Sequence, residues 1–179
     1  MERGTLKLKL YIIDTKSENR KRFSIFDELG NERYTVSLEY TPLTTKIDVY
    51  DIYMKKLAKI RKRDVITFNT FTISCKSPSH AKNKLRIISN LLNFKDCFYM
   101  CGINWLIRGD IISKNFELID VDSSIVMRHE KKEKQSKTVY EINISDDKNE
   151  ILCVCISLCI DILNTNAVKN MVRPIKATD

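Results

Sequence analysis

The chain has 179 residues, of which 43% are hydrophobic, and this length and composition are enough to bury one sizeable core. Lys and Arg number 31 against 23 Asp and Glu, which gives a net charge of +8 and an isoelectric point near 9.2 and favours anionic partners. Because the first residues are charged and no apolar window reaches the roughly 17 residues that a membrane-spanning helix needs, we expect no signal peptide, no transmembrane span and a cytoplasmic location.

Most of the chain predicts β-strands. From Leu6 to Ile12, apolar residues alternate with polar residues or Tyr, a period of two that buries one face of a strand and exposes the other. The same pattern predicts further strands at about 22–27, 32–39, 46–51, 57–63, 70–75, 84–89, 99–107, 115–120, 124–131 and 137–144.

A hairpin-like unit recurs in this series, starting at Phe23, Ile47 and Phe116. Each copy has apolar residues two apart, a short turn and a second strand, and an Asp ends its first strand: Asp27, Asp51 or Asp120. In the first copy, Gly30 can adopt the positive φ that a tight turn needs. Repeated hairpins predict a meandering antiparallel sheet, and so many strands in one domain favour closure, because closure removes exposed edges.

The run from Ile151 to Leu163, ILCVCISLCIDIL, predicts a helix. Asp147 and Glu150 have the spacing of an N-terminal capping box, and acidic residues suit the N-terminal end of a helix dipole, so the helix should start near Lys148. A helix that is apolar on all sides must be enclosed. We therefore predict a mainly β protein whose sheet wraps around a C-terminal helix.

The sequence carries no motif for catalysis, nucleotide binding or metal binding. His80 and His129 stand near no carboxylate-and-nucleophile arrangement, and no Gly-rich phosphate loop occurs in a chain with four glycines. Three of the six cysteines lie in the predicted helix and the chain is too long to need disulfides, so we expect free thiols. Because the CxxC pairs of structural zinc sites are absent, we expect no metal, and we expect no cofactor. The cysteines are Cys75, Cys97, Cys101, Cys153, Cys155 and Cys159.

Cations alternate with apolar residues in two predicted strands. Lys59, Arg61 and Arg63 alternate in this way in the strand at 57–63, and Lys84 and Arg86 do so in the strand at 84–89, so their side chains should point outward. If these strands are neighbours, the five cations form one anion-binding patch; the alternative is that they are ordinary solvated faces of a basic protein. A second cluster predicts a charged loop between strands: Arg128, Lys131, Lys132, Lys134 and Lys137.

Several segments together resemble the LURP-one-related family, which belongs with the tubby C-terminal domain and the phospholipid scramblases. They read FSIFDELGNERYTV, KIDVYD, LAKIRKR, WLIRGDIISKNFELID and YEINISDDKNEILCVCISLCIDIL. The Trp-x-Ile-x-Gly-Asp signature from Trp105 to Asp110 is the most specific part, and the resemblance covers roughly residues 5 to 163. It implies a closed, roughly twelve-stranded antiparallel barrel over residues 1–163 that encloses a hydrophobic helix at about 147–163, and it leaves 164–179 as a loosely ordered tail.

The resemblance implies no catalytic site, so we expect a non-enzymatic binding module. Tubby-like domains bind phosphoinositides through outward basic strands, and the same role here would place anionic phospholipid headgroups against Lys59, Arg61, Arg63, Lys84 and Arg86, with the protein peripheral at the inner membrane face. A nucleic-acid-associated regulator is a second hypothesis that draws on the same charge, although no recognition helix is predicted. A third hypothesis is a scramblase-like membrane-associated protein, which the short apolar run opposes, and a fourth is an interaction domain with no lipid role.

Overall fold

The computed structural model describes residues 6–13, 22–41, 44–64, 68–75, 84–90, 98–134 and 137–171. Within these ranges it contains twelve strands, one 3-10 helix and one α-helix. The strands are β1 Leu8–Ile13, β2 Arg22–Asp27, β3 Glu32–Tyr40, β4 Thr44–Tyr50, β5 Lys56–Asp64, β6 Phe68–Cys75, β7 Lys84–Asn90, β8 Phe98–Cys101, β9 Leu106–Asp110, β10 Asn115–Ile119, β11 Ile125–Lys134 and β12 Lys137–Ile144; the helices are η1 Asp147–Asn149 and α1 Glu150–Met171.

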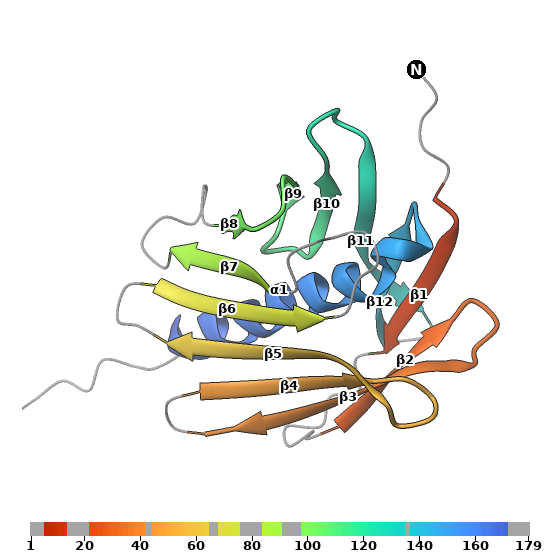
Figure 1. Ribbon diagram of the computed structural model, residues 1–179, viewed down its shortest axis with the longest axis horizontal. Helices are drawn as coiled ribbons and strands as arrows, with labels where there is room; N and C mark the ends of the chain where they lie inside the picture. The colour runs from red at the N-terminus through yellow and green to blue at the C-terminus, as the bar shows by residue number, and fades with distance from the viewer. Residues whose placement is uncertain are drawn as a thin grey trace, which may run out of the picture.

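The strands form one antiparallel sheet that curls into a nearly closed barrel (Figure 1). Their order is β8-β7-β6-β5-β4-β3-β2-β1-β12-β11-β10-β9, so sequence neighbours pair except for β8 and β9, and β1 pairs with β12 to join the two ends of the chain. The gap in the barrel lies between β8 and β9, which are the two end strands of the sheet and are not paired with each other. The predicted twelve-stranded antiparallel barrel is therefore confirmed.

Helix α1 runs through the interior of the barrel, and its residues 152–160 are all buried (Figure 1). Fully buried inward side chains of the strands surround it, and each such side chain contributes about 1.5–3 kcal/mol of burial free energy. They include Ile25, Val36, Ile47, Ile60, Ile73, Ile87, Leu118, Met127 and Ile142. The enclosed helix is confirmed, and it continues to Met171, beyond the predicted end at Leu163.

The start of the helix differs from the predicted capping box. Asp146, not Asp147, is the N-cap residue, and its Oδ1 accepts a hydrogen bond from the Lys148 backbone N–H at 3.0 Å. The Glu150 carboxylate instead accepts two hydrogen bonds from Arg33 on β3, from Nε at 2.8 Å and Nη2 at 2.9 Å. This contact joins the helix to the barrel wall, which a local capping box would not do.

The recurring hairpin unit has one turn geometry in all three copies. The first Asp of each turn accepts, through Oδ1, the backbone N–H groups two and four residues later, at 2.9 to 3.0 Å. The residue three positions after each Asp has positive φ: Gly30 at 82°, Met54 at 61° and Ser123 at 62°. Because successive strands run in opposite directions, these turns after β2, β4 and β10 all lie at the end of the barrel where α1 begins.

Two predictions about the strands were wrong. The segment predicted as one strand at 99–107 is two strands, β8 and β9, separated by a turn in which Gly102 has φ 105°. The predicted charged loop is mostly strand, because β11 extends to Lys134 and β12 begins at Lys137.

The Trp-x-Ile-x-Gly-Asp signature closes the β9–β10 hairpin. Trp105 is buried, and Asp110 accepts a hydrogen bond from the Ser113 backbone N–H at 3.0 Å. Gly109 has φ 113°, and a Cβ at this position would lie 2.8 Å from the Asn115 carbonyl oxygen, so only glycine fits.

Candidate functional site

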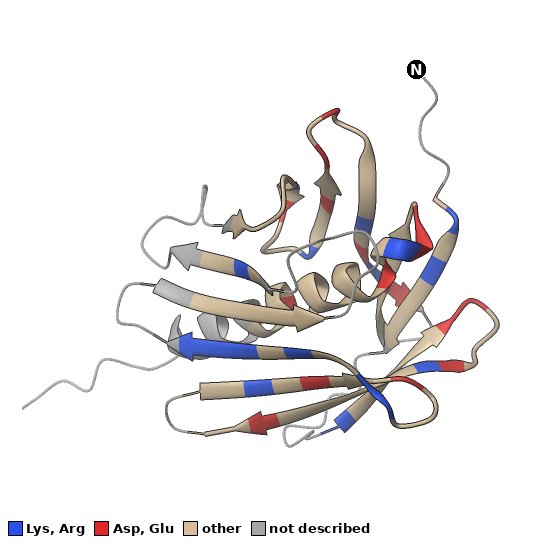
Figure 2. Cartoon of the chain, viewed as in Figure 1, with Lys and Arg blue, Asp and Glu red and all other residues tan. Residues whose placement is uncertain are grey.

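Strand β5 carries three of the predicted cations, and Figure 2 shows Lys and Arg along this strand. Ala58 and Ile60 are buried against the interior, and the alternation turns Lys59, Arg61 and Arg63 outward. The two arginines are exposed and Lys59 is half-buried.

The strands that carry the five predicted cations are not neighbours, because β6 lies between β5 and β7. The register places Thr72 of β6 between Arg61 and Arg86, and Ser74 between Lys59 and Lys84. Since adjacent strands are about 4.8 Å apart, the backbones at Arg61 and Arg86 are roughly 10 Å apart. The cations therefore flank a row of hydroxyl side chains, a surface that we call the β5–β7 patch: Lys59, Arg61, Arg63, Thr70, Thr72, Ser74 and Arg86. The side chain of Lys84 lies outside the described residues.

The carboxylates beside the β5–β7 patch are already paired with other cations. On β4, Asp48 lies opposite Lys59 in the register, and its Oδ2 accepts from Lys56 Nζ at 2.8 Å. Lys46 lies opposite Arg61, and its Nζ binds Glu39 Oε2 at 2.7 Å. Within the described part of the chain, Lys59, Arg61, Arg63 and Arg86 form no ion pair, so their charges remain available to an external anion.

The outer surface of β9 to β11 is also rich in cations, but these are paired. Glu117 on β10 lies between Arg108 of β9, at 2.6 Å, and Arg128 of β11, at 2.8 Å. The hydrogen bond from Arg108 is the main cause that lowers the pKa of the Glu117 carboxyl, and Arg128 adds to it. A hollow of about 520 Å³ lies on this surface, lined by both signs of charge.

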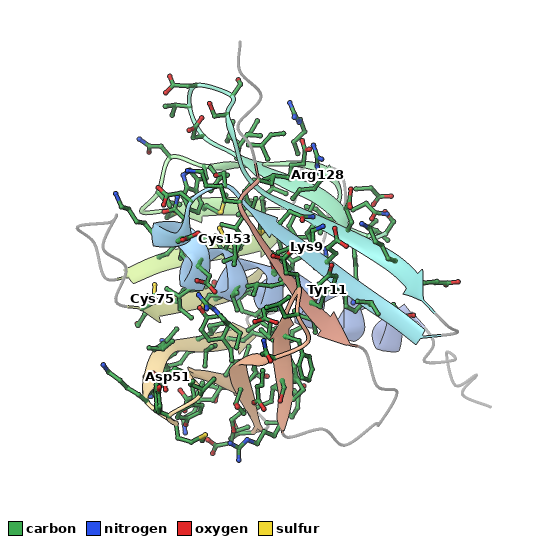
Figure 3. All side chains as sticks on the ribbon, turned by 90° about the vertical axis from the view of Figure 1, so that its right-hand side faces the viewer. Lys9, Tyr11, Asp51, Cys75, Arg128 and Cys153 are labelled. Atoms are coloured by element: carbon green, nitrogen blue, oxygen red, sulfur yellow. The ribbon has the colours of Figure 1, made fainter. Side chains whose placement is uncertain are left out.

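The pairing extends across β12 to β1. Glu141 of β12 binds Lys132 of β11 at 2.9 Å and lies 4.0 Å from Lys9 of β1. Burial alone would raise the pKa of the Glu141 carboxyl, but its bonds to Lys132 and Asn143 hold it below the ordinary value. Figure 3 shows Lys9 and Arg128 on the side of the barrel away from Asp51 and the β4–β5 hairpin. The two sides of the barrel therefore differ in how fully their cations are neutralised.

A buried polar cluster inside the barrel was not predicted from the sequence. His129 of β11 is fully buried and stacks against Phe116, with ring centroids 4.7 Å apart. Its Nδ1 lies 2.8 Å from the Lys114 carbonyl oxygen, and its Nε2 lies 3.7 Å from Asp161 Oδ2 on α1. Lys114 Nζ approaches Asp161 Oδ1 at 3.4 Å and the Tyr140 hydroxyl at 3.1 Å.

This cluster has the composition of a structural network. Within the described residues, His129 makes no hydrogen bond to a Ser, Thr or Cys side chain, as a hydrolytic triad would require. The signal in the sequence that could have found the cluster is Asp161, the one acidic residue in the run ILCVCISLCIDIL. Asp161 marks where the apolar helix surface meets polar groups of β11 and the β9–β10 turn.

The five described cysteines are free thiols, and Cys97 lies outside the described residues. Burial raises the pKa of the Cys153, Cys155 and Cys159 thiols on α1, whereas Cys101 is exposed. Figure 3 shows Cys153 on the helix inside the strands. In the described part of the chain, no group of three or more His, Cys, Asp or Glu residues is placed to hold a metal ion.

We expect maleimide labelling of the native protein at pH 8 to distinguish these thiols. Cys101 should label rapidly, whereas the three thiols on α1 should label only as fast as the protein unfolds, because burial excludes the reagent and suppresses the thiolate. Peptide mass spectrometry after timed labelling measures each site. Labelling of Cys155 as fast as Cys101 would contradict the enclosed helix, and an intact mass lowered by lost hydrogens would contradict the prediction of reduced thiols.

In the described part of the chain, neither helix has a stretch with the length and hydropathy of a membrane-spanning segment. The enclosure of α1 explains its apolar surface without lipid, because the strands cover every side of residues 152–160.

Known proteins resemble this chain in sequence or in fold over most of its length. The chain is 23% identical to the uncharacterized protein YxjI of Bacillus subtilis over 144 aligned residues. The aligned region covers 80% of this chain and 86% of that protein. It also resembles the crystal structure of a protein from Arabidopsis thaliana, with a TM-score of 0.54 and 12% sequence identity. The match covers 88% of this chain and 91% of that chain and shows a similar fold. The LURP-one-related family model matches residues 8–161, from β1 to the buried part of α1. The chain belongs to the LURP-one-related family.

Proposed function

We propose that the protein is a non-enzymatic binding module for anionic phospholipid headgroups, and that the β5–β7 patch is its binding surface. The observation that supports this most is the contrast between the two sides of the barrel. Arg108 of β9 and Arg128 of β11 share Glu117, and Lys132 of β11 and Lys9 of β1 share Glu141. Lys59, Arg61, Arg63 and Arg86, by contrast, have no carboxylate partner among the described residues. The likeness of the family to tubby-like domains, which bind phosphoinositides, agrees with this proposal.

The chemistry of the patch suits a phosphate-bearing surface. Guanidinium groups donate paired hydrogen bonds to phosphate oxygens, and the hydroxyls of Thr70, Thr72 and Ser74 can donate one each. Each Lys or Arg near an anionic bilayer contributes about 1 kcal/mol, so the described cations together supply roughly 4 kcal/mol before ordering costs. This is enough for reversible, salt-sensitive attachment and supports peripheral binding.

Single-stranded nucleic acid is the second candidate ligand, and the β5–β7 patch contains no aromatic side chain for it, since the exposed Tyr40 and Tyr53 lie outside the patch. Binding of unpaired bases relies on aromatic side chains that stack with them. Phe71 and Phe116 are buried in the core, and Phe23 packs partly buried against it, so these rings are not presented to a ligand.

Replacement of Lys59, Arg61 and Arg63 by Gln should abolish binding to phosphatidylcholine vesicles that contain phosphatidylserine. The melting temperature should stay nearly unchanged, because exposed charges contribute little to folding. Vesicle co-sedimentation measures the binding, and calorimetry measures the melting temperature.

The matched control is the triple replacement of Lys7, Lys131 and Lys148 by Gln. These three residues are exposed and lie away from β5 to β7, so this variant loses the same net charge and should still bind. Equal loss of binding in both variants would show a response to overall charge and would refute the assigned surface.

A further inference from the structure

The turn between β4 and β5 carries an exposed apolar tip. Ile52, Tyr53 and Met54 are consecutive, and their exposed fractions are 59%, 84% and 50%. They contribute to neither the core nor a strand, because they lie between Tyr50, the last residue of β4, and Lys56, the first of β5.

The two turns of the same geometry elsewhere in the barrel show that the fold does not require this tip. The corresponding residues are Glu28, Leu29 and Gly30 after β2, and Val121, Asp122 and Ser123 after β10. Each of these turns has the same hydrogen bonds from its first Asp, and neither has three consecutive apolar residues. Met54 even occupies the left-handed position that Gly30 fills in the first turn, and this conformation is unfavourable for a residue with a side chain.

The tip lies toward the outer surface of the sheet, where Met54 contacts Arg22. Arg22 points outward from the start of β2, since Ile25 points inward, and its Nη2 lies 3.1 Å from Met54 Sδ. Lys55 beside the tip is exposed, and Lys56 lies over the outward Tyr50 ring at 5.5 Å. The apolar tip therefore borders cations on the same hairpin that carries Lys59, Arg61 and Arg63.

We propose that Ile52, Tyr53 and Met54 insert into the boundary between headgroups and acyl chains of an anionic bilayer while the β5–β7 patch binds the headgroups. This inference rests on the proposed lipid function and adds a second, apolar contribution to it. Tyr favours the membrane interface because its ring is apolar and its hydroxyl stays hydrated, and the flanking cations match the anionic surface.

Tryptophan fluorescence of Tyr53→Trp tests the insertion. On vesicles of phosphatidylcholine and phosphatidylserine, its emission should shift to the blue and be quenched by lipids brominated on the acyl chain; the parent protein, whose Trp105 is buried, supplies the background. The matched control is Val121→Trp, at a 72% exposed position in the turn after β10, which should show neither change. A soluble protein partner for the tip would leave the emission unchanged on vesicles.

A second variant separates this inference from the proposed function. The triple replacement Ile52→Ser, Tyr53→Ser and Met54→Gly should weaken vesicle binding about tenfold or more, because the three apolar side chains that enter the bilayer are lost. Salt-sensitive binding through the patch should remain. If the parent binds vesicles, Tyr53→Trp shows no blue shift and the triple variant binds as tightly as the parent, the insertion is overturned and the proposed function is not. Absence of parent binding to anionic vesicles overturns the proposed function and, with it, the insertion.

Discussion

Replacement of Val154 by Asp is expected to destabilise the protein severely, by several kcal/mol. Val154 is completely buried on α1 among apolar side chains of the barrel, so the new carboxylate would have no partner there. An uncompensated buried charge costs about 3–5 kcal/mol, which is comparable to the total stability of about 5–15 kcal/mol of a domain. Circular dichroism and urea titration measure the outcome.

Two controls make this expectation specific to burial. Val154→Ala removes only apolar volume and should cost about 1–3 kcal/mol, and Val121→Asp in an exposed turn should change stability by less than about 0.5 kcal/mol. A chain truncated before Asp146 should be insoluble, because the inward faces of the strands would lose the helix that they cover. A Val154→Asp variant that melts like the parent, or a soluble and cooperatively folding truncation, would contradict the enclosed helix.

Replacement of Arg33 by Met should destabilise the protein by about 2 kcal/mol, because it leaves the Glu150 carboxylate without its charged partner. Glu150 is buried at the start of α1, and Arg33 binds it through both Nε and Nη2. We place the cost below that of a fully buried pair because the Arg33 side chain is 46% exposed and water screens it. Urea titration of the single variants measures the change.

A double-mutant cycle tests whether the contact itself is responsible. Arg33→Met combined with Glu150→Leu should recover more than half of the loss, since no unpaired charge remains. Arg33→Lys keeps the charge but loses the paired geometry and should fall between parent and Arg33→Met. If the change in unfolding free energy of the double variant equals the sum of the changes of the two single variants, the two side chains act independently.

The sequence predicted the barrel well because each strand has one buried and one solvated face. The alternation around Ala58 and Ile60 assigned Lys59, Arg61 and Arg63 to the outside without any knowledge of strand order, and the exposed arginines agree. The five-cation patch depended on strands 57–63 and 84–89 being neighbours. The predicted meander already placed the strand at 70–75 between them, so the sequence itself contained the reason for the correction.

The features that the sequence did not predict depend on contacts between distant segments. The Arg33–Glu150 pair joins residues 117 positions apart. From the sequence alone, the position of Glu150 was explained by a local capping box instead. The direction in which the β4–β5 turn leans depends on the contact of Arg22 with Met54, 32 positions apart. The turn geometry shared by Asp27, Asp51 and Asp120 is local, and there the repeat in the sequence was informative.

The central claim, that the protein binds anionic phospholipid through surface charge, is tested most directly by co-sedimentation of the unaltered chain with vesicles over a series of salt concentrations. We predict binding to phosphatidylcholine vesicles that contain phosphatidylserine or a phosphoinositide, no binding to phosphatidylcholine alone, and a steady loss of binding as salt shortens the Debye length below about 10 Å. Mobility shifts with DNA and RNA in the same buffers should be weaker. No binding to any anionic vesicle, with tight and salt-sensitive binding to nucleic acid, would contradict the claim.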